Sequence, residues 1–292
     1  MNVFLVDGTY ELFRHFYAVP RTTSADGIEI GAVRGVIGSL LGMLEEGVTH
    51  IGVATDHVVE SFRNELWPGY KSSEGLDPDI LNQFQPLEDA LEALGLVVWK
   101  TVRYEADDAL ASAAVRAAGD RRVEQVFVCT PDKDLAQVVD GGRIVQFDRR
   151  SGSVRDADGV REKFGVGPRS IPDYLALMGD SADGFPGVKG WGAKSAATVL
   201  ARYAHLEDIP DAAGTWEVQV RGAARLAGAL ADAREEAALF RDLATLRTTL
   251  PVFEDVEELC WTGPQPRFFD LCARINAPGY FRRAQAVVSS RS

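Results

Sequence analysis

Several carboxylates follow strand-like runs of the sequence, and residues of this kind can bind metal ions. Asp7 ends the apolar run at residues 3–6, and Asp56 ends the run at residues 51–56. Further acids follow the run at 126–130 or open the predicted helix at 105–118, namely Asp132, Asp134, Glu105, Asp107 and Asp108. A single Asp after a strand is usually a turn or capping residue, so only the convergence of many acids points to chemistry.

The carboxyl ends of parallel strands meet at one edge of a sheet, where ligands commonly bind. Carboxylates gathered at such an edge repel one another strongly unless cations neutralise them. Oxygen ligands without His or Cys suit Mg²⁺ or Mn²⁺. Two such ions can promote in-line attack on a phosphodiester. The grouping of acids therefore predicts a site for two Mg²⁺ or Mn²⁺ ions that hydrolyses phosphodiester bonds.

The segment 179–196 is rich in glycine and suits a phosphate backbone. A P-loop does not fit, because Ala193 separates Gly192 from Lys194, and the glycine spacing is wrong for a dinucleotide-binding fingerprint. A helical hairpin with its turn at residues 190–192 fits better, because N–H groups at the next helix N-terminus can face a phosphate. Lys189 and Lys194 flank the turn. An ordinary turn between two helices is the alternative.

The elements that must position these residues alternate between strands and helices in the first half of the chain. We expect strands at residues 3–6, 51–56, 96–99, 126–130 and 144–148, and helices at 31–46, 79–94 and 105–118. Apolar runs separated by helices indicate a mostly parallel sheet. Residues 149–152 suggest a hairpin turn, and the pattern is helical over 171–250, so a domain boundary is expected near 160–170.

Composition places the chain among globular proteins. The 292 residues are 46% hydrophobic and 25% charged, with a net charge of -12, which excludes a disordered or collagen-like chain. No apolar run is long enough to span a membrane, and the N-terminus lacks the basic start of a signal peptide, so a cytoplasmic protein is expected. The cysteines Cys129, Cys260 and Cys272 form no C-x-x-C motif and the histidines are scattered, which disfavours a structural zinc site.

Ordered motifs give the chain a family resemblance that runs from about residue 3 to at least residue 250. The motifs are Asp7-Gly8, Phe62-Arg63, Tyr70-Lys71, Tyr104-Glu105-Ala106-Asp107-Asp108, Asp132-Lys133-Asp134-Leu135-Ala136-Gln137, Leu177-Met178-Gly179-Asp180-Ser181 and the hairpin from Pro186 to Gly192. In this order they resemble the bacterial 5′-nuclease or flap endonuclease family, similar to the N-terminal 5′-3′ exonuclease domain of DNA polymerase I.

The resemblance implies an α/β fold and a domain order. A PIN-like catalytic domain, with a mostly parallel sheet flanked by helices, is expected over residues 1–168 and a helical arch at about 72–99. A helix–three-turn–helix (H3TH) DNA-binding domain is expected over residues 169–255. The segment 256–292 is expected to pack back on the body.

The resemblance also assigns roles to residues. The first metal cluster is expected to contain Asp7, Asp56, Glu105, Asp107 and Asp108, and the second Asp132, Asp134, Asp180 and Asp183. Lys71 corresponds to the lysine that meets the scissile phosphate, and the expected catalytic residues are Lys71, Asp7, Asp56, Asp107 and Asp132. The expected DNA-binding residues are Arg63, Lys71, Lys189, Gly190, Trp191, Gly192, Lys194 and Ser195. Backbone carbonyls of the glycine hairpin are expected to hold a potassium ion.

The implied activity is structure-selective 5′-3′ exonuclease or flap endonuclease cleavage of DNA in replication and repair. Its expected partners are DNA with 5′ ends, flaps, nicks or gaps and a DNA polymerase acting in trans, and the chain is expected to be a monomer. Two alternatives stay open: a catalytically weakened paralogue that binds DNA structures, and a PIN-type ribonuclease. Ribonucleases of that type lack the hairpin domain.

One departure from the family concerns the charge of the expected arch. Glu74 stands where the family usually has an arginine, three residues after Lys71. Between Lys71 and Lys100 the chain has no basic residue, but it has the acids Glu74, Asp77, Asp79, Glu88, Asp89 and Glu92. An acidic arch is expected to hold a 5′ strand less well.

Overall fold

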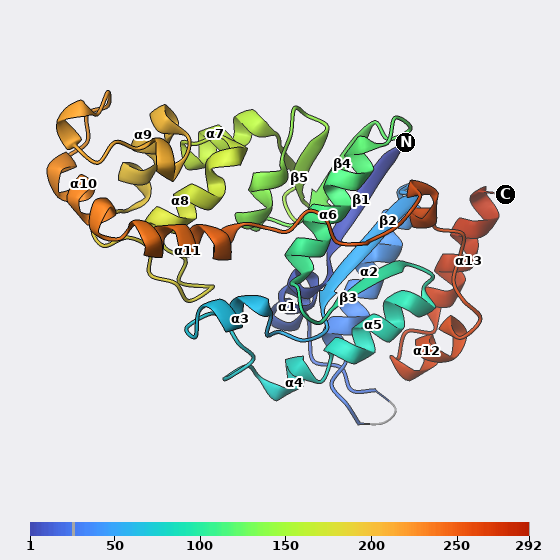
Figure 1. The fold of residues 1–292 in the computed structure, drawn as a ribbon. Helices are drawn as coiled ribbons and strands as arrows, with labels where there is room; N and C mark the ends of the chain where they lie inside the picture. Colours follow the sequence, from blue (N-terminus) through green and yellow to red (C-terminus); the bar gives the residue numbers. More distant parts are fainter. Residues whose placement is uncertain (25–26, 292) are drawn as a thin grey trace. The chain divides into compact units, whose positions relative to one another are not determined.

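The computed structural model describes residues 1–24 and 27–291, and the chain forms two compact units. Unit 1 comprises Met1–Val59, Ser73–Thr130 and Thr248–Ser292, and unit 2 comprises Glu60–Ser72 and Pro131–Arg247. Figure 1 shows both units and labels most of their helices and strands. The domain limits expected at residues 168 and 255 stay predictions.

Unit 1 is built on parallel strands. They are β1 (Asn2–Asp7), β2 (His50–Asp56), β3 (Val97–Thr101) and β4 (Gln125–Cys129). Within this unit they lie in the order β3-β2-β1-β4, with every neighbouring pair parallel. Leu5 and Val6, which point to opposite faces of β1, are both fully buried. Both faces of the sheet are therefore covered, as the continuous apolar runs predicted.

The connections decide which helices cover which face (Figure 1). The helices are α1 (Gly8–Ala18) and α2 (Gly31–Glu45) between β1 and β2, α5 (Phe84–Ala93) between β2 and β3, and α6 (Ala106–Gly119) between β3 and β4. The last crossover runs back past β1, so right-handed connections put α6 on the opposite face from the others. Accordingly, α6 packs against all four strands, whereas α1, α2 and α5 pack against one another.

The prediction of one continuous helix over residues 79–94 is wrong. The structure has a short helix α4 (Pro78–Leu81) and then α5, with the chain turning at Gln83. The Gln83 side chain is fully buried, and its Oε1 accepts from the backbone N–H groups of Ala32 and Val33 at 3.1 and 3.3 Å. It thus caps the start of α2, which has no cap of its own.

The arch expected over residues 72–99 is wrong in its second half, because α5 and β3 belong to the core of unit 1. Glu88, counted as an arch acid, has no exposed surface. Thr55 Oγ1 donates to Glu88 Oε1 at 2.9 Å, and Nδ1 of His57 lies 2.8 Å from Oε2. Only the residues before α5 are left to form an arch.

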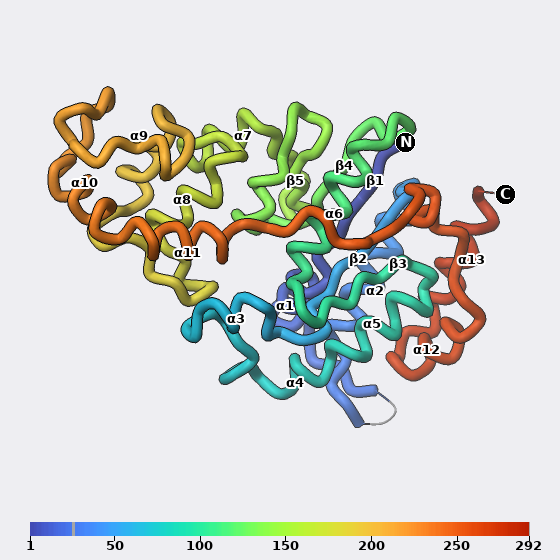
Figure 2. The backbone as a smooth tube through the Cα atoms, in the orientation of Figure 1, coloured from blue at the N-terminus to red at the C-terminus, as the bar shows by residue number. Residues whose placement is uncertain are grey.

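The C-terminal segment packs onto unit 1 (Figure 2). It contains the 3₁₀ turn η5 (Val256–Leu259) and the helices α12 (Phe268–Arg274) and α13 (Gly279–Arg291). Helix α12 packs against α5, and α13 packs against α2. An ion pair of 2.8 Å between Arg283 and Glu45 joins α13 to α2.

Unit 2 consists of one hairpin and many helices. The hairpin is β5 (Ile144–Asp148) with β6 (Ser153–Arg155), antiparallel around the predicted turn. The helical elements are α3 (Phe62–Leu66), η1 (Asp134–Val138), α7 (Ala157–Phe164), η2 (Pro168–Ser170), α8 (Ile171–Met178), α9 (Ala193–Tyr203), η3 (Leu206–Asp208), η4 (Ala213–Thr215), α10 (Ala223–Asp232) and α11 (Arg234–Ala244).

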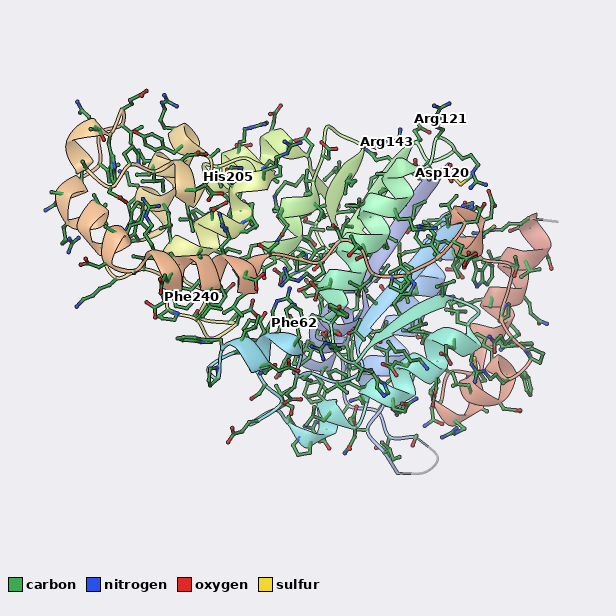
Figure 3. The ribbon with its side chains drawn as sticks, in the orientation of Figure 1. Phe62, Asp120, Arg121, Arg143, His205 and Phe240 are labelled. Atoms are coloured by element: carbon green, nitrogen blue, oxygen red, sulfur yellow. The ribbon has the colours of Figure 1, made fainter. Side chains whose placement is uncertain are left out.

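The core of unit 2 is aromatic. Phe240, which α11 carries (Figure 3), stacks on Phe185 with 5.5 Å between ring centroids and meets Trp67 edge-on at 5.3 Å. The predicted fold class, a mostly parallel sheet flanked by helices and then a helical domain, is confirmed. Among the described helices, none has the length and apolar character that crossing a membrane requires.

Candidate metal centres

The carboxyl end of β1 presents Asp7, which is buried. Its Oδ1 accepts from the backbone N–H of Tyr10 at 2.8 Å and so caps α1, and its Oδ2 accepts from Thr130 Oγ1 at 3.0 Å. The next residue, Gly8, must be a glycine, because a Cβ there would lie 2.8 Å from the carbonyl oxygen of Ala54. The start of α1 therefore lies against β2 and holds Asp7 at the strand ends.

The end of β2 joins the start of α6. Asp56 Oδ1 accepts from the backbone N–H of Ala106 at 2.8 Å, and the backbone N–H of Asp56 donates to Thr9 Oγ1 at 2.9 Å. Asp108 is fully buried, and its Oδ2 accepts from the backbone N–H of Glu105 at 3.0 Å. This is a capping-box contact, since the acid three residues into the helix bonds back to the capping residue.

The first expected cluster is thus assembled at one edge of the unit 1 sheet. Asp7 and Asp56 end neighbouring strands, with Asp7 paired to Ala54. Glu105, Asp107 and Asp108 lie at the start of α6, which the Asp56 carboxylate contacts. Backbone N–H groups and hydroxyls hold this edge, and the N-terminus of α6 favours negative charge there.

The second cluster lies in unit 2 and is more tightly packed. One carboxylate oxygen from each of Asp134, Asp180 and Asp183 lies within 4.8 Å of the others, and all three residues are buried. Asp132, the fourth expected member, accepts from the backbone N–H of Asp134 at 2.9 Å and so turns the chain into η1.

Close backbone packing brings these acids together. Asp180 pairs with Phe185 in an isolated bridge, which closes the loop that carries Asp183. Gly184 has φ +82°, and a Cβ there would lie 2.0 Å from the carbonyl oxygen of Gly69. Trp67 Nε1 also donates to the Gly184 carbonyl at 3.0 Å. The loop of Asp180 and Asp183 therefore lies against residues 67–71, the segment that ends with the predicted catalytic lysine.

Two lysines partly offset the charge of these aspartates. Lys71 Nζ lies 3.2 Å from Asp183 Oδ1, and Lys133 Nζ lies 2.6 Å from Asp180 Oδ2. Burial lowers the pKa of Lys133, but Asp134, Asp180 and Asp132 outweigh it and raise that pKa above its usual value. Lys133 was not among the predicted site residues, although its place between two of the acids is a signal the sequence offers.

Asp134 is the member of the second cluster whose ionised form is most disfavoured by its surroundings. Burial first, and then the charges of Asp132 and Asp183, raise the pKa of the Asp134 carboxyl well above its usual value. Its Oδ1 is buried and has no hydrogen-bond partner among the described residues. A buried carboxylate oxygen without a hydrogen-bond partner is costly, so this oxygen favours a cation or a proton as its partner.

The predicted glycine hairpin faces a cavity of about 710 Å³. Gly190 has φ +85°, a conformation that favours glycine, and Lys189 and Lys194 are exposed beside it. The lining also includes Thr198, Gln219 and Arg221, which the sequence reasoning missed because no motif marks residues 219–221.

Some expected DNA-binding residues have other partners. The ring of Trp191 is buried, and its Nε1 donates to the Leu226 carbonyl at 3.1 Å, so this side chain belongs to the core. Ser195 Oγ accepts from the backbone N–H of Gly192 at 3.0 Å, so that N–H is already used within the hairpin.

Arg63 is another expected DNA-binding residue whose side chain has partners within the protein. It is 1% exposed, and its Nε donates to the Leu243 carbonyl at 2.7 Å and its Nη2 to the Thr245 carbonyl at 3.2 Å. Both carbonyls lie at the end of α11, where unpaired carbonyls attract a cation. Arg63 therefore holds a helix end, and its expected DNA-binding role stays a prediction that its burial does not support.

Comparisons with known proteins agree with this architecture. Residues 2–165 match the 5′-3′ exonuclease N-terminal resolvase-like domain, and residues 166–267 match the 5′-3′ exonuclease C-terminal SAM fold. DNA polymerase I of Pseudomonas aeruginosa is 39% identical over 272 residues, which cover 89% of this chain and 29% of that protein. DNA polymerase I of Rhizobium leguminosarum is 34% identical over 268 residues, which cover 88% of this chain and 26% of that protein. The chain thus spans less than a third of the length of these relatives.

Solved structures share the fold at low sequence identity. The zinc-bound 5′-exonuclease of bacteriophage T5 has a TM-score of 0.64 over 99% of both chains, at 19% identity. Flap endonuclease-1 from Methanococcus jannaschii has a TM-score of 0.63 over 100% of this chain and 93% of that one, at 13% identity. The fold is therefore that of the 5′ nucleases. The chain belongs to the 5′-3′ exonuclease family, and the predicted family is confirmed.

Proposed function

We propose that this chain is a divalent-metal-dependent 5′ nuclease that hydrolyses DNA at 5′ ends, flaps, nicks or gaps. The family supports the reaction class, since both halves of the chain match 5′-3′ exonuclease domains. The observation that carries the proposal is the buried group of Asp134, Asp180 and Asp183. A structural role alone does not account for three buried carboxylates so close together.

The residues present fit divalent ions. When all are ionised, the four carboxylates of Asp132, Asp134, Asp180 and Asp183 carry four negative charges, against the two positive charges of Lys71 and Lys133. The difference of two matches one divalent cation, and the unpartnered oxygen of Asp134 suits an additional ligand contact. Oxygen-only donors favour Mg²⁺ or Mn²⁺. Such ions supply a polarised phosphate and an activated water in hydrolysis.

The first cluster fits the same chemistry with different support. By resemblance to the family, the carboxylates of Asp7, Asp56 and the start of α6 are expected to hold a divalent ion of their own. In the proposed reaction, each cluster holds a divalent ion within its own unit. Finer proposals are that the ions are Mg²⁺ or Mn²⁺ and that a potassium ion binds in the hairpin at residues 190–192.

Residues of the chain bind and orient the DNA. Lys71 lies beside the second cluster through its 3.2 Å contact with Asp183, which suits an ammonium that meets the scissile phosphate. Lys189 and Lys194 are exposed next to Gly190, where they are available to duplex phosphates. Contacts of this kind position DNA without reading its sequence, as a structure-selective enzyme requires.

Cleavage assays test the proposal directly. The substrates are 5′-flap, nicked and single-stranded DNA and the matching RNA, each with Mg²⁺, Mn²⁺ or EDTA. We expect metal-dependent cleavage of the DNA substrates that have 5′ ends, and none in EDTA. Binding without cleavage in either metal would favour a DNA-structure-binding paralogue, and preferential cleavage of the RNA would favour a ribonuclease.

Proposals about cellular context follow from this activity. A DNA polymerase acting in trans would use the gap that a 5′ nuclease leaves, and we propose one as a partner. The cytoplasmic location and the monomeric state stay predictions from the sequence.

A further inference from the structure

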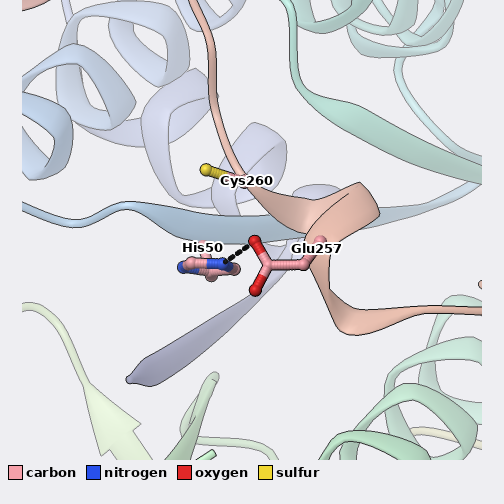
Figure 4. Close-up of side chains that lie close together, drawn as sticks. All are labelled: His50, Glu257 and Cys260. Carbon is pink, nitrogen blue, oxygen red and sulfur yellow. Dashed lines mark hydrogen bonds and ion pairs between the residues drawn. The ribbon is translucent and has the colours of Figure 1, made fainter. Parts of the chain in front are cut away.

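A second group of metal-binding residue types lies in unit 1, away from the carboxylates of the strand edge. One ligand atom from each of His50, Glu257 and Cys260 lies within 4.8 Å of the others (Figure 4). His50 is buried, Cys260 is half-buried and Glu257 is exposed. The group combines a nitrogen, an oxygen and a sulfur donor, unlike the acidic clusters of the proposed nuclease site.

The local fold explains why residues so distant in sequence meet. Cys260 pairs with His50 in an antiparallel bridge, and the backbone N–H of Trp261 donates to the Thr49 carbonyl at 2.8 Å. The turn η5 precedes this bridge, and residues three apart on a 3₁₀ turn lie on the same side. Glu257 and Cys260 have that spacing. The bridge therefore fixes Cys260 beside His50, and the turn brings Glu257 to both.

The imidazole of His50 is held as metal-bound histidines are. Its Nδ1 lies 2.9 Å from Thr49 Oγ1, which leaves Nε2 facing Glu257 Oε2 at 3.5 Å. A good N–H···O bond is shorter, about 2.7–3.2 Å. Two ligands about 2.0–2.1 Å from a tetrahedral zinc ion lie roughly 3.3 Å apart. The observed separation is thus closer to that of two metal ligands than to that of a hydrogen bond.

The surroundings orient Glu257 without using both of its oxygens. Arg122 Nη1 lies 3.8 Å from Glu257 Oε1, the carboxylate oxygen that does not face His50. That guanidinium makes shorter contacts with Asp120, at 2.6 Å, and Asp255, at 2.8 Å. Its charge is therefore largely offset, and Oε2 stays directed at the imidazole.

We propose that His50, Glu257 and Cys260 form a zinc-binding site that ties the turn at residues 256–260 to the start of β2. Thiolate and imidazole donors select zinc over Mg²⁺, and three protein ligands leave one tetrahedral position for water. The scatter of His and Cys in the sequence disfavoured such a site. That reasoning considered only nearby residues, whereas His50 and Glu257 are 207 residues apart in the chain and meet only in the fold.

Cobalt titration of the metal-stripped chain tests the site. Cobalt(II) bound to a thiolate gives a charge-transfer band in the near ultraviolet, which carboxylate sites cannot produce. We expect this band for the natural sequence and for Cys272→Ser, a matched control at a buried cysteine outside the group. Cys260→Ser should abolish the band, and His50→Ala should weaken it strongly. A band that persists in Cys260→Ser, or no band in the natural sequence, overturns the proposal.

Alkylation of the natural sequence provides a test that needs no variant to fold. Cys260 is the free cysteine that is not buried, so a thiol reagent should modify it first. Zinc at ten times its dissociation constant should slow this modification about tenfold, as occupancy of one site requires. Mass spectrometry of the peptide with Cys260 measures the rate, and Glu257→Gln should lessen the protection. An unchanged rate with zinc overturns the proposal even if nuclease activity is metal-dependent.

Discussion

The two groups of expected metal ligands are built in opposite ways. In unit 1, Asp7, Asp56 and Asp108 accept hydrogen bonds from backbone N–H groups and so also cap helices or join elements. In unit 2, Asp134 and its neighbours are buried against one another, with lysines as their main cations. Each unit positions carboxylates, and in unit 2 burial and the neighbouring acids raise the pKa of Asp134 well above its usual value.

This difference shows that a carboxylate expected to bind metal can either stabilise or destabilise the metal-free protein, depending on its surroundings. Backbone dipoles compensate the negative charge of the unit 1 acids, so these residues contribute to folding without an ion. Like charges in unit 2 oppose burial, so that cluster depends on a cation for its stability. Substitutions in the two groups should therefore have the same effect on activity and opposite effects on stability.

The largest expected effect is on cleavage. Asp134→Ala and Asp7→Ala each remove a proposed metal ligand, so each should lower the single-turnover cleavage rate by at least about 10²–10³-fold, the scale of losing one group that stabilises the transition state. The measurement uses a 5′-flap DNA at saturating Mg²⁺. Asp158→Ala, at an exposed acid of unit 2, is the control and should keep the natural rate. Natural turnover by Asp134→Ala would remove that residue from the site.

Lys71→Ala should have the next largest effect. An ammonium that contacts the phosphate acts most strongly in the transition state, where negative charge develops. The substitution should therefore raise the activation barrier of the single-turnover reaction by about 2–4 kcal/mol, with little change in DNA affinity. Rapid-quench kinetics with enzyme in excess separate the two quantities. The rate of Lys133→Ala provides the comparison for Lys71→Ala, because Lys133 is also a lysine of the second cluster but pairs with Asp180. If Lys71→Ala only raises the dissociation constant, the lysine is a binding residue and its assignment fails.

The sequence predicts the strand-edge group well because its logic is local. Asp7 and Asp56 end apolar strands, and parallel pairing of β1 with β2 brings the strand ends together. The start of α6 is also visible as a run of acids before an alanine-rich helix. Strand periodicity and topology rules are sufficient for these placements.

Residues whose roles depend on tertiary partners were predicted less well. Arg63 and Trp191 occupy motif positions and look available in the sequence, but both are buried with backbone carbonyls as partners. Glu88 looked like a surface acid but is the buried partner of His57. Nothing in the local sequence distinguishes a solvated charged residue from one that pairs across the core.

The metal-free stability of Asp134→Asn tests the unit 2 half of the comparison. Because the folded-state pKa of Asp134 is raised above its unfolded value, stability falls as the pH rises through the unfolded-state pKa, and the full penalty is present above the raised pKa. Asp134→Asn should therefore be more stable than the natural protein near pH 7, by about 1–3 kcal/mol. The gain should shrink as the pH falls through the unfolded-state pKa of about 3.9, below which Asp is protonated in both states.

Denaturant melts in EDTA at several pH values measure this gain. Asp158→Asn, at an exposed position, is the matched control and should change little. Lower stability of Asp134→Asn at neutral pH would mean that the Asp134 carboxylate stabilises the metal-free fold. That would contradict the claim that repulsion between the unit 2 carboxylates destabilises it.

Asp7→Ala tests the unit 1 half and should have the opposite sign. The substitution removes the acceptor for the Tyr10 N–H and the Thr130 hydroxyl, so the metal-free protein should lose about 0.5–2 kcal/mol, the usual cost of losing a helix cap. Asp7→Asn keeps a capping oxygen and should restore most of the loss. Urea melts in EDTA compare the three proteins. Equal stability of Asp7→Ala and the natural protein would contradict a capping role.

The smallest expected effect concerns what is left of the acidic arch. Since α5 belongs to the core, the acids that can meet a 5′ strand are Glu74, Asp77 and Asp79. Asp79 is paired with Arg21 at 2.6 Å, which reduces the acidic charge further. Glu74 is exposed, so its repulsion of DNA is screened and is worth a few tenths of a kcal/mol, less at higher salt.

Glu74→Arg should therefore raise cleavage of a 5′-flap substrate by about two- to threefold at low salt, as a few tenths of a kcal/mol for each of the two charge units predict. A nicked duplex has no free 5′ strand and should gain far less. Single-turnover rates on both substrates at low and moderate salt make the comparison, with Glu74→Gln expected to lie midway. An equal gain on both substrates would place Glu74 near the duplex. No gain on the flap would show that charge in this segment does not set substrate choice, which then rests on the ligands of the two clusters and the hairpin at residues 190–192.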